Sequence, residues 1–351
     1  MQGVHPLLDP DGNPFRDGTF AASVAGQPIC EGRFRGCIWA MPMDAEWACN
    51  ELGTEHFNGV SCCPWCPADR DRFNVRDCSK AACWKPFVYV PGHARIVSAH
   101  PIWQRGLGTS RFTYIGDWMH SGDGGVLLLL HASVFKDLLS PGEPFGDGSA
   151  AGNRGKLWEA LQQGYIDADE RKRLYNLPLE MIGGLESGTY PKLKAKCNES
   201  KCLVKPMLLM LIKFDDGSDR AAHRIQCYQR LHRMNVIMAE GGLFLTEEAA
   251  ADLLSSCEAF MQHYSWLAVK SMEAGLLRYN VTPKLHYLWH IAYFGRFQNP
   301  KAVWCYGFED FVGRIQRVCR SCTCGTAMHK VPAKVFRNYA SGLSRVLCKR
   351  T

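Results

Sequence analysis

Short apolar runs, broken by polar turns, characterise the first 140 residues. The runs at 34–41, 87–89 and 112–115 are short and rich in aromatic and β-branched side chains, as in strands. A helix is expected over Ala45–Leu52, directly after the first run, and the largely apolar segment 126–139 predicts a buried helix. We therefore expect an α/β arrangement in this part of the chain.

Beyond residue 140 the pattern becomes helical. Segment 140–155 is rich in Gly, Pro and Ser, which predicts a loop. Thr246 precedes two glutamates and then apolar residues at helical spacing, which predicts the start of a long helix. Helices are expected at 156–163, 167–174, 204–214, 221–239, 247–274 and Val331–Leu347, the last one packed on the core.

Composition narrows the class of protein only slightly. The chain has 351 residues, enough for one large or two ordinary domains, and a net charge of +7, which is compatible with a polyanionic partner. Seventeen cysteines without an apolar secretory segment favour a reducing compartment. The apolar runs are too short to span a bilayer. We expect a nuclear or cytoplasmic chain that is not secreted and has no membrane partner.

Two cysteines and two histidines have the spacing of metal ligands. Cys63 and Cys66 form a C-x-x-C motif, and His286 and His290 lie one helical turn apart, so that both imidazoles share a face. Together they would complete a tetrahedral zinc site. Two alternatives remain: a local site that uses Cys78 and Cys83 in place of the histidines, and a thiol redox pair.

Two carboxylates occupy matching positions around these ligands. Asp44 precedes Cys63 by 19 residues, and Glu309 follows His290 by 19. If one zinc ion joins the cysteines to the histidines, the segments that carry both carboxylates are drawn together. Paired carboxylates suit a two-metal phosphoryl-transfer site. The simpler interpretation is that Asp44, like Asp117, caps a helix.

Four segments in this order resemble the catalytic half of cut-and-paste DNA transposases. They are MDAEWACNELG, GDWMHSGDGGV, KLHYLWHI and WCYGFEDFVGRI. The chain is similar, over 33–347, to DDE transposases with an RNase H-like core, of the CACTA-type (CMC) superfamily and its relatives, the Transib transposases and the V(D)J recombinase catalytic subunit. Each segment alone is weak; their order makes the resemblance more specific.

The resemblance implies a partial RNase H-like core with a zinc knuckle over 1–139, an all-helical insertion over 140–275, and C-terminal helices over 276–351. It places Asp44 and Glu309 in a catalytic site. In the intact family, three carboxylates hold two Mg²⁺ or Mn²⁺ ions that act on DNA, while zinc is structural. DNA is the implied partner, and a homodimer is compatible with it.

The same resemblance places Asp117 and His120 beside the active site. Nothing before Asp44 resembles the strand that carries the family's first catalytic aspartate. We therefore expect an N-terminally truncated transposase-like chain that does not cleave DNA efficiently, because two carboxylates hold a pair of ions poorly.

Another interpretation is a non-catalytic, zinc-stabilised module that binds DNA or protein. A basic patch supports binding to phosphates, although a solvated charged surface explains it equally well. This patch comprises Lys192, Lys194, Lys196, Lys201 and Lys205. A second metal site in the C-x2-C-x-C-x4-H segment from Cys319 to His329 is weakly indicated, because its spacing matches no familiar zinc motif.

Overall fold

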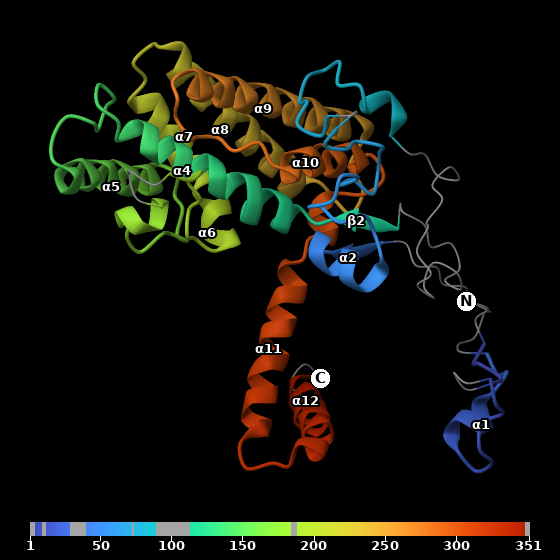
Figure 1. Cartoon of the computed structure of the whole chain (residues 1–351). Helices are drawn as coiled ribbons and strands as arrows, with labels where there is room; N and C mark the ends of the chain where they lie inside the picture. The colour runs from blue at the N-terminus through green and yellow to red at the C-terminus, as the bar shows by residue number, and fades with distance from the viewer. Residues whose placement is uncertain are drawn as a thin grey trace.

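The computed structural model describes residues 4–8, 12–28, 40–71, 74–88, 113–183 and 188–347, with side chains as far as residue 342 (Figure 1). These residues are mostly helical. The α-helices are α1 (Phe20–Val24), α2 (Ala45–Leu52), α4 (Leu127–Leu138), α5 (Ala150–Asp167), α6 (Cys197–Cys202), α7 (Val204–Lys213), α8 (Asp219–Glu240), α9 (Glu247–Glu273), α10 (Pro283–Phe294), α11 (Tyr306–Thr323) and α12 (Val331–Leu347). The shorter helices are η1 (Lys85–Phe87), η2 (Met119–Val126, a π-helix), η3 (Leu179–Ile182), η4 (Pro300–Val303) and η5 (Met328–Lys330).

A two-stranded parallel sheet joins distant parts of the chain. Strand β1 (Met41–Met43) pairs with β2 (Tyr114–Gly116), with Met43 opposite Gly116. The described residues show these two strands in one sheet, so an RNase H-like core remains a prediction. The expected strand at 87–89 is wrong at Phe87, which ends the 3₁₀-helix η1; residues 34–39, 89 and 112 lie outside the described ranges.

The helix predicted over Ala45–Leu52 is confirmed as α2. Asp44 caps it, since its Oδ1 accepts the amides of Glu46 and Trp47 at 2.8 and 2.9 Å. At the other end, Gly53 has a φ of 66°, in the left-handed region that glycine enters without strain. The cap therefore starts α2 immediately after β1.

The apolar segment 126–139 forms a buried helix as predicted, continuous with η2 (Figure 1). Glycines in η2 allow other helices to approach closely. A Cβ at Gly124 would lie 2.6 Å from Cys197 Sγ of α6, and one at Gly125 would lie 2.6 Å from Lys284 Cδ of α10. Both contacts bring the start of this long helix against α6 and α10.

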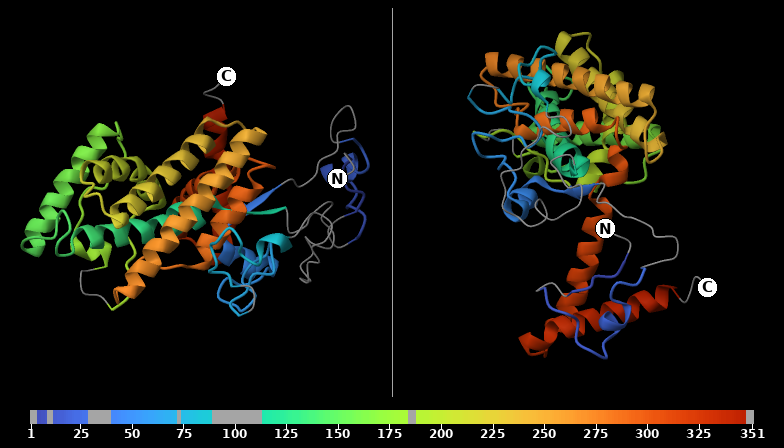
Figure 2. Two further views of the ribbon diagram at one scale, coloured as in Figure 1. Left: turned by 90° about the horizontal axis from the view of Figure 1, so that it is seen from above. Right: turned by 90° about the vertical axis from the view of Figure 1, so that its right-hand side faces the viewer.

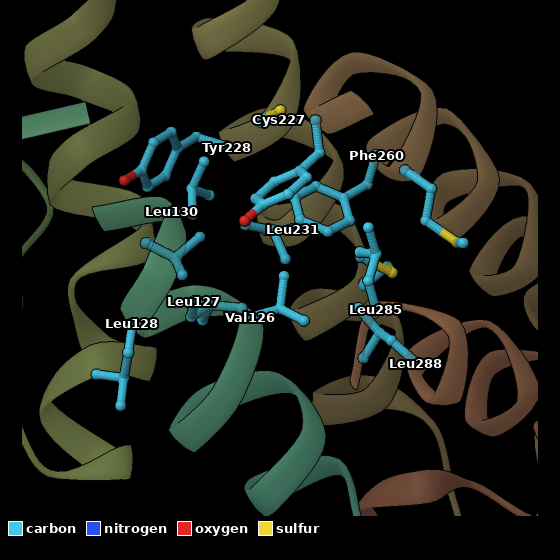
Figure 3. Packing of buried hydrophobic residues seen from close by; sticks show 14 of the residues in the cluster. Val126, Leu127, Leu128, Leu130, Cys227, Tyr228, Leu231, Phe260, Leu285 and Leu288 are labelled. Atoms are coloured by element: carbon cyan, nitrogen blue, oxygen red, sulfur yellow. The ribbon is translucent and has the colours of Figure 1, made fainter. Parts of the chain in front are cut away.

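Helices α4 and α7 to α10 pack around one core, seen from close by in Figure 3. Val126, Leu127 and Leu130 face side chains of α8, α9 and α10 in that view. A buried histidine of α4 also contacts α8 and α6: His131 Nδ1 accepts the Tyr228 hydroxyl at 2.7 Å, and Nε2 donates to the Ser200 carbonyl at 3.0 Å.

Two helix boundaries differ from the sequence prediction. Helix α5 begins at Ala150, inside the predicted loop 140–155, because Ser149 caps it by accepting the Gly152 amide. It ends at Asp167, so the helix predicted at 167–174 is wrong. Asp169 has a φ of 50°, and the Tyr165 hydroxyl accepts the Leu174 amide at 3.2 Å, a contact that fixes a turn. The start of α9 after Thr246 is confirmed.

Helices α11 and α12 form a hairpin that extends away from the helical body (Figures 1 and 2). Phe311 of α11 meets Tyr339 of α12 edge to face, with ring centroids 5.9 Å apart, and Asn338 Nδ2 donates to Cys322 Sγ at 3.2 Å. The expectation that Val331–Leu347 packs on the core is therefore wrong: its partner is α11. The start of α11 contacts the body, where Tyr306 Oη donates to Asp123 and Glu309 lies near His120.

Candidate metal centre

A buried group of two cysteines and two histidines lies between the loop after α2 and helix α10. The ligand atoms of Cys63, Cys66, His286 and His290 all lie within 4.8 Å of one another. Cys66 Sγ is 3.4 Å from His286 Nε2, which in turn is 3.1 Å from His290 Nε2. All four residues are fully buried, so this group could bind a metal ion such as zinc.

The observed separations fit tetrahedral zinc. Zinc–sulfur bonds of about 2.3 Å and zinc–nitrogen bonds of about 2.0–2.1 Å place neighbouring N and S atoms about 3.6 Å apart, and two N atoms about 3.4 Å apart. The distances above are close to both values. Since four protein ligands fill a tetrahedral shell, such an ion would be structural.

Backbone amides of the loop that carries Cys63 and Cys66 donate hydrogen bonds to both sulfur atoms. The Trp65 amide donates to Cys63 Sγ and the Ala68 amide donates to Cys66 Sγ, both at 3.4 Å. Burial raises the pKa of the Cys63 thiol well above its usual value, because a desolvated thiolate without a cation is unfavourable. A bound dication would remove that penalty, which is why this donor set suits zinc.

The surroundings of His286 and His290 also favour metal binding. Burial, followed by the proximity of His286, lowers the pKa of His290 well below its usual value and so favours the neutral imidazole that a metal requires. Trp84 meets the His286 ring edge to face at 4.3 Å, and Trp65 packs 5.5 Å from the His290 ring. These aromatic rings exclude water from the group.

The alternative ligands are not grouped in this way. Cys78 is buried, and burial raises its pKa to about 11, whereas Cys83 is exposed; neither belongs to a metal-type group within the described ranges. The same holds for the C-terminal segment from Cys319 to His329, most of which is exposed.

An acidic edge lies beside the metal centre, where the two strands end. Since Met43 pairs with Gly116, the next residues, Asp44 and Asp117, follow neighbouring strands at the same edge of the sheet. Trp65 ties this edge to the centre, because its Nε1 donates to the Tyr114 carbonyl of β2 at 3.1 Å. Strand ends of parallel sheets are common ligand sites.

Asp117 is a buried carboxylate with four donors around it. Its Oδ1 accepts the amides of Met119 and Cys305 at 3.2 and 2.7 Å. Its Oδ2 accepts the His120 amide at 2.9 Å and lies 2.6 Å from His120 Nδ1. These contacts fill the roughly four acceptor positions of a carboxylate. Asp117 thereby orients His120 and holds the start of α11 against β2.

His120 connects the carboxylates at this edge. Its Nε2 lies 3.7 Å from Glu309 Oε1 of α11. Burial disfavours the charged imidazole, but the hydrogen bond with Asp117 and the charges of Asp117, Asp44 and Glu309 outweigh it and raise the pKa of His120. The three carboxylates singled out at this edge from the sequence therefore all influence the imidazole of His120. Cys305, whose thiol joins Asp117 and His120 in a compact group, was missed, because no motif marks it.

An open pocket of about 540 Å³ adjoins the edge. Asp44 and His120 line it together with four basic side chains: Arg70, Arg76, Lys192 and Lys284. Lys284 Nζ donates to the His120 carbonyl at 3.0 Å, and burial lowers the pKa of this lysine. Acidic and basic groups thus face the same pocket.

No protein-family model matches the sequence, and no curated protein matches it either. Within the described ranges, no helix is long and apolar enough to cross a membrane. The fold and the site therefore define the protein at a coarse level: a mostly helical chain with a small parallel sheet and a buried Cys₂His₂ group that could hold a metal ion.

Proposed function

We propose that the chain is a transposase-like DNA-binding protein in which structural zinc positions an acidic edge that binds one Mn²⁺ or Mg²⁺ ion. The observation that carries the proposal is the convergence at His120. Asp44 and Asp117 follow two paired strands, and Glu309 reaches the same imidazole from α11. Three of the four segments that resemble DDE transposases carry these residues.

The number of available ligand atoms favours one ion over two. Oδ1 of Asp44 serves the α2 cap, and Oδ2 is not used by that cap. Asp117 is engaged by four donors, so the groups left to face an ion are Asp44, His120 and Glu309. Their ligand atoms do not all lie within 4.8 Å of one another in this structure, so the proposal includes a shift of the exposed Glu309 side chain toward the ion. Three ligands from protein leave positions for water or phosphate oxygen. Two-metal catalysis needs more carboxylate than this, so we propose that DNA cleavage is slow.

Basic side chains around two hollows support DNA as the partner. One hollow of about 590 Å³ is lined by Trp158 and by Arg171, Lys172, Arg173 and Lys196. A second of about 280 Å³ is lined by Lys201, Lys205, Lys301 and Trp304. Lysine and arginine clusters attract phosphates without reading sequence. Four of the five lysines noted in the sequence line these cavities: Lys196 the first hollow, Lys201 and Lys205 the second, and Lys192 the pocket at the acidic edge.

The ion site is tested by Mn²⁺ titration of the zinc-loaded chain, followed by electron paramagnetic resonance. We expect one Mn²⁺ per chain, and at least tenfold weaker binding in Glu309→Gln. Asp310→Asn is the matched control, because the neighbouring Asp310 pairs with Arg314 at 2.6 Å. Equal loss in both variants, or no bound Mn²⁺, would overturn the ion site. Rapid Mn²⁺-dependent nicking of supercoiled DNA that Asp44→Ala abolishes would overturn slow cleavage.

DNA binding is tested separately by fluorescence anisotropy over a range of salt concentrations. Removing Lys172 and Arg173 together should lower the slope of log affinity against log salt by about 1.8, since each duplex phosphate contact contributes about 0.9. Lys213→Ala, an exposed lysine at the end of α7, is the control and should leave the slope unchanged. An unchanged slope in the double variant would refute the basic hollows as the DNA site.

The second candidate, a non-catalytic zinc-stabilised binding module, is favoured by one observation: the two basic hollows are lined by other residues than the acidic edge. Under this alternative, DNA binds equally well to wild type and to the Asp44→Asn and Glu309→Gln variants, and Mn²⁺ changes nothing. The Mn²⁺ titration above separates the two candidates.

A further inference from the structure

A pair of histidines faces one another between the two longest helices, apart from the centre described above. His223 of α8 and His263 of α9 lie with their Nδ1 atoms 3.0 Å apart and their ring planes at 70°. Both side chains are half-buried, so the pair is accessible from solvent. Neither residue belongs to a recognisable motif in the sequence.

The separation of the two nitrogens suits a shared metal ion. Two imidazoles on one ion, with metal–nitrogen bonds of about 2.0–2.1 Å and an angle between 90° and 109°, have their nitrogens about 2.9–3.4 Å apart. The two histidines of the buried centre, His286 and His290, show nearly the same separation, 3.1 Å. The surface pair therefore has the geometry of adjacent ligands.

The surroundings hold the rings in this position. The indole of Trp266 stacks on the His223 ring, with centroids 3.9 Å apart and planes within 9°. Asp219 lies one turn before His223 on α8 and raises its pKa, but burial has the larger effect, so the pKa of His223 is lowered. Burial and the charges of His223 and Arg230 also lower the pKa of His263. Both imidazoles are thus suited to be neutral ligands.

We propose that His223 and His263 form a second, surface metal site that takes a borderline divalent transition-metal ion such as Ni²⁺, Cu²⁺ or Zn²⁺. Imidazole ligands suit these ions, and affinity rises toward Cu²⁺ along the first row. A bound ion would clamp α8 to α9, the helices that make the most extensive contact within the body. This site is independent of the proposed function.

The test is calorimetric titration of Ni²⁺ into the chain with its buried centre already loaded with zinc, in a His120→Ala background so that the proposed ion site at the acidic edge does not compete for Ni²⁺. We expect one Ni²⁺ equivalent that is bound at least tenfold more weakly in His223→Ala and in His263→Ala. When added together, the losses in the two single variants should be more than the loss in the double variant, because both ligands serve one ion. His232→Ala is the matched control, since His232 lies on the same helix but beside Lys205 in the smaller basic hollow.

A plain hydrogen bond between the two rings is the competing explanation. The His263→Asn variant distinguishes the metal site from a plain hydrogen bond, because an amide can still hydrogen-bond to His223 but is a poor ligand for these ions. We expect Ni²⁺ to raise the melting temperature of wild type and not that of His263→Asn. Absence of a Ni²⁺ equivalent in wild type, retention of it in His263→Asn, or equal loss in His232→Ala would each overturn the proposal. Zinc content and circular dichroism verify that every variant is folded.

Discussion

Replacing Asp117 by asparagine should destabilise the protein strongly, because the carboxylate accepts from four donors. An asparagine has one carbonyl oxygen, which can accept two of these contacts. Its NH₂ group would face the other two donors, either the amides of Met119 and Cys305 or the two nitrogens of His120. If the NH₂ group faces His120, the neutral imidazole can change tautomer and accept at Nδ1, so that one donor remains unpaired. Each buried donor left without an acceptor costs about 1–3 kcal/mol, and this is the expected loss.

The assay is urea unfolding at pH 7, read as the change in midpoint at constant slope. The matched control is Asp123→Asn. Asp123 is buried as well, but its Oδ2 accepts from Tyr306 Oη at 2.8 Å, a bond that an amide oxygen can replace. We expect no loss in the control. A loss below about 1 kcal/mol for Asp117→Asn, or an equal loss in both variants, would refute the role of Asp117 as the group that holds α11 and His120.

Three further outcomes are expected. Burial raises the pKa of Asp123 to about 7, so its contribution to stability is complete below the unfolded value near 3.8 and is lost as pH rises through 7. The advantage of Asp123→Asn over wild type should therefore be larger at pH 8 than at pH 5, by about 2.7 kcal/mol at most, because the two pH units from 5 to 7 contribute about 1.36 kcal/mol each. A pH-independent difference would contradict this. Cys66→Ser should release zinc, as measured by elemental analysis of the purified protein. Cys62→Ser should retain zinc, because Cys62 does not belong to the group of four ligands. Zinc retained in both variants would exclude Cys66 as a ligand. Gly124→Ala should lower the free energy of unfolding, measured with urea, by about 1–3 kcal/mol, because its Cβ would meet Cys197 Sγ at 2.6 Å. Adding Cys197→Ala should restore part of that loss. A Gly124→Ala variant as stable as wild type would show that α6 moves freely.

Local patterns sufficed to predict much of the helical structure. The caps at Asp44 and Thr246 and the apolar segment 126–139 act over a few residues, so their signals are readable from the chain itself. The predicted loop 140–155 is wrong at its end, where α5 begins at Ala150, because a Gly- and Ser-rich stretch can still be helical when Ser149 caps it. The predicted packing of α12 on the core is wrong, because its amphipathic pattern indicates that it packs on another element but does not indicate which one.

The site was predictable to the extent that ligand chemistry constrains distant residues. Cysteine and histidine pairs at metal-ligand spacing suggested a shared ion, and the structure brings those four side chains together. The interaction between Asp117 and the Cys305 amide could not be foreseen, because it spans 188 residues and depends on a backbone donor with no sequence signature. The contact between His223 and His263 likewise depends on how α8 and α9 align.

The coordination of the buried centre is the most direct test, because the proposal has one ion join the cysteine loop to α10 beside the acidic edge, to which Trp65 links that loop. Zinc X-ray absorption on the purified chain should show one zinc with two sulfur neighbours near 2.3 Å and two nitrogen neighbours near 2.0–2.1 Å. A zinc-free yet folded chain, or an all-sulfur shell, would contradict the joining of Cys63 and Cys66 to His286 and His290.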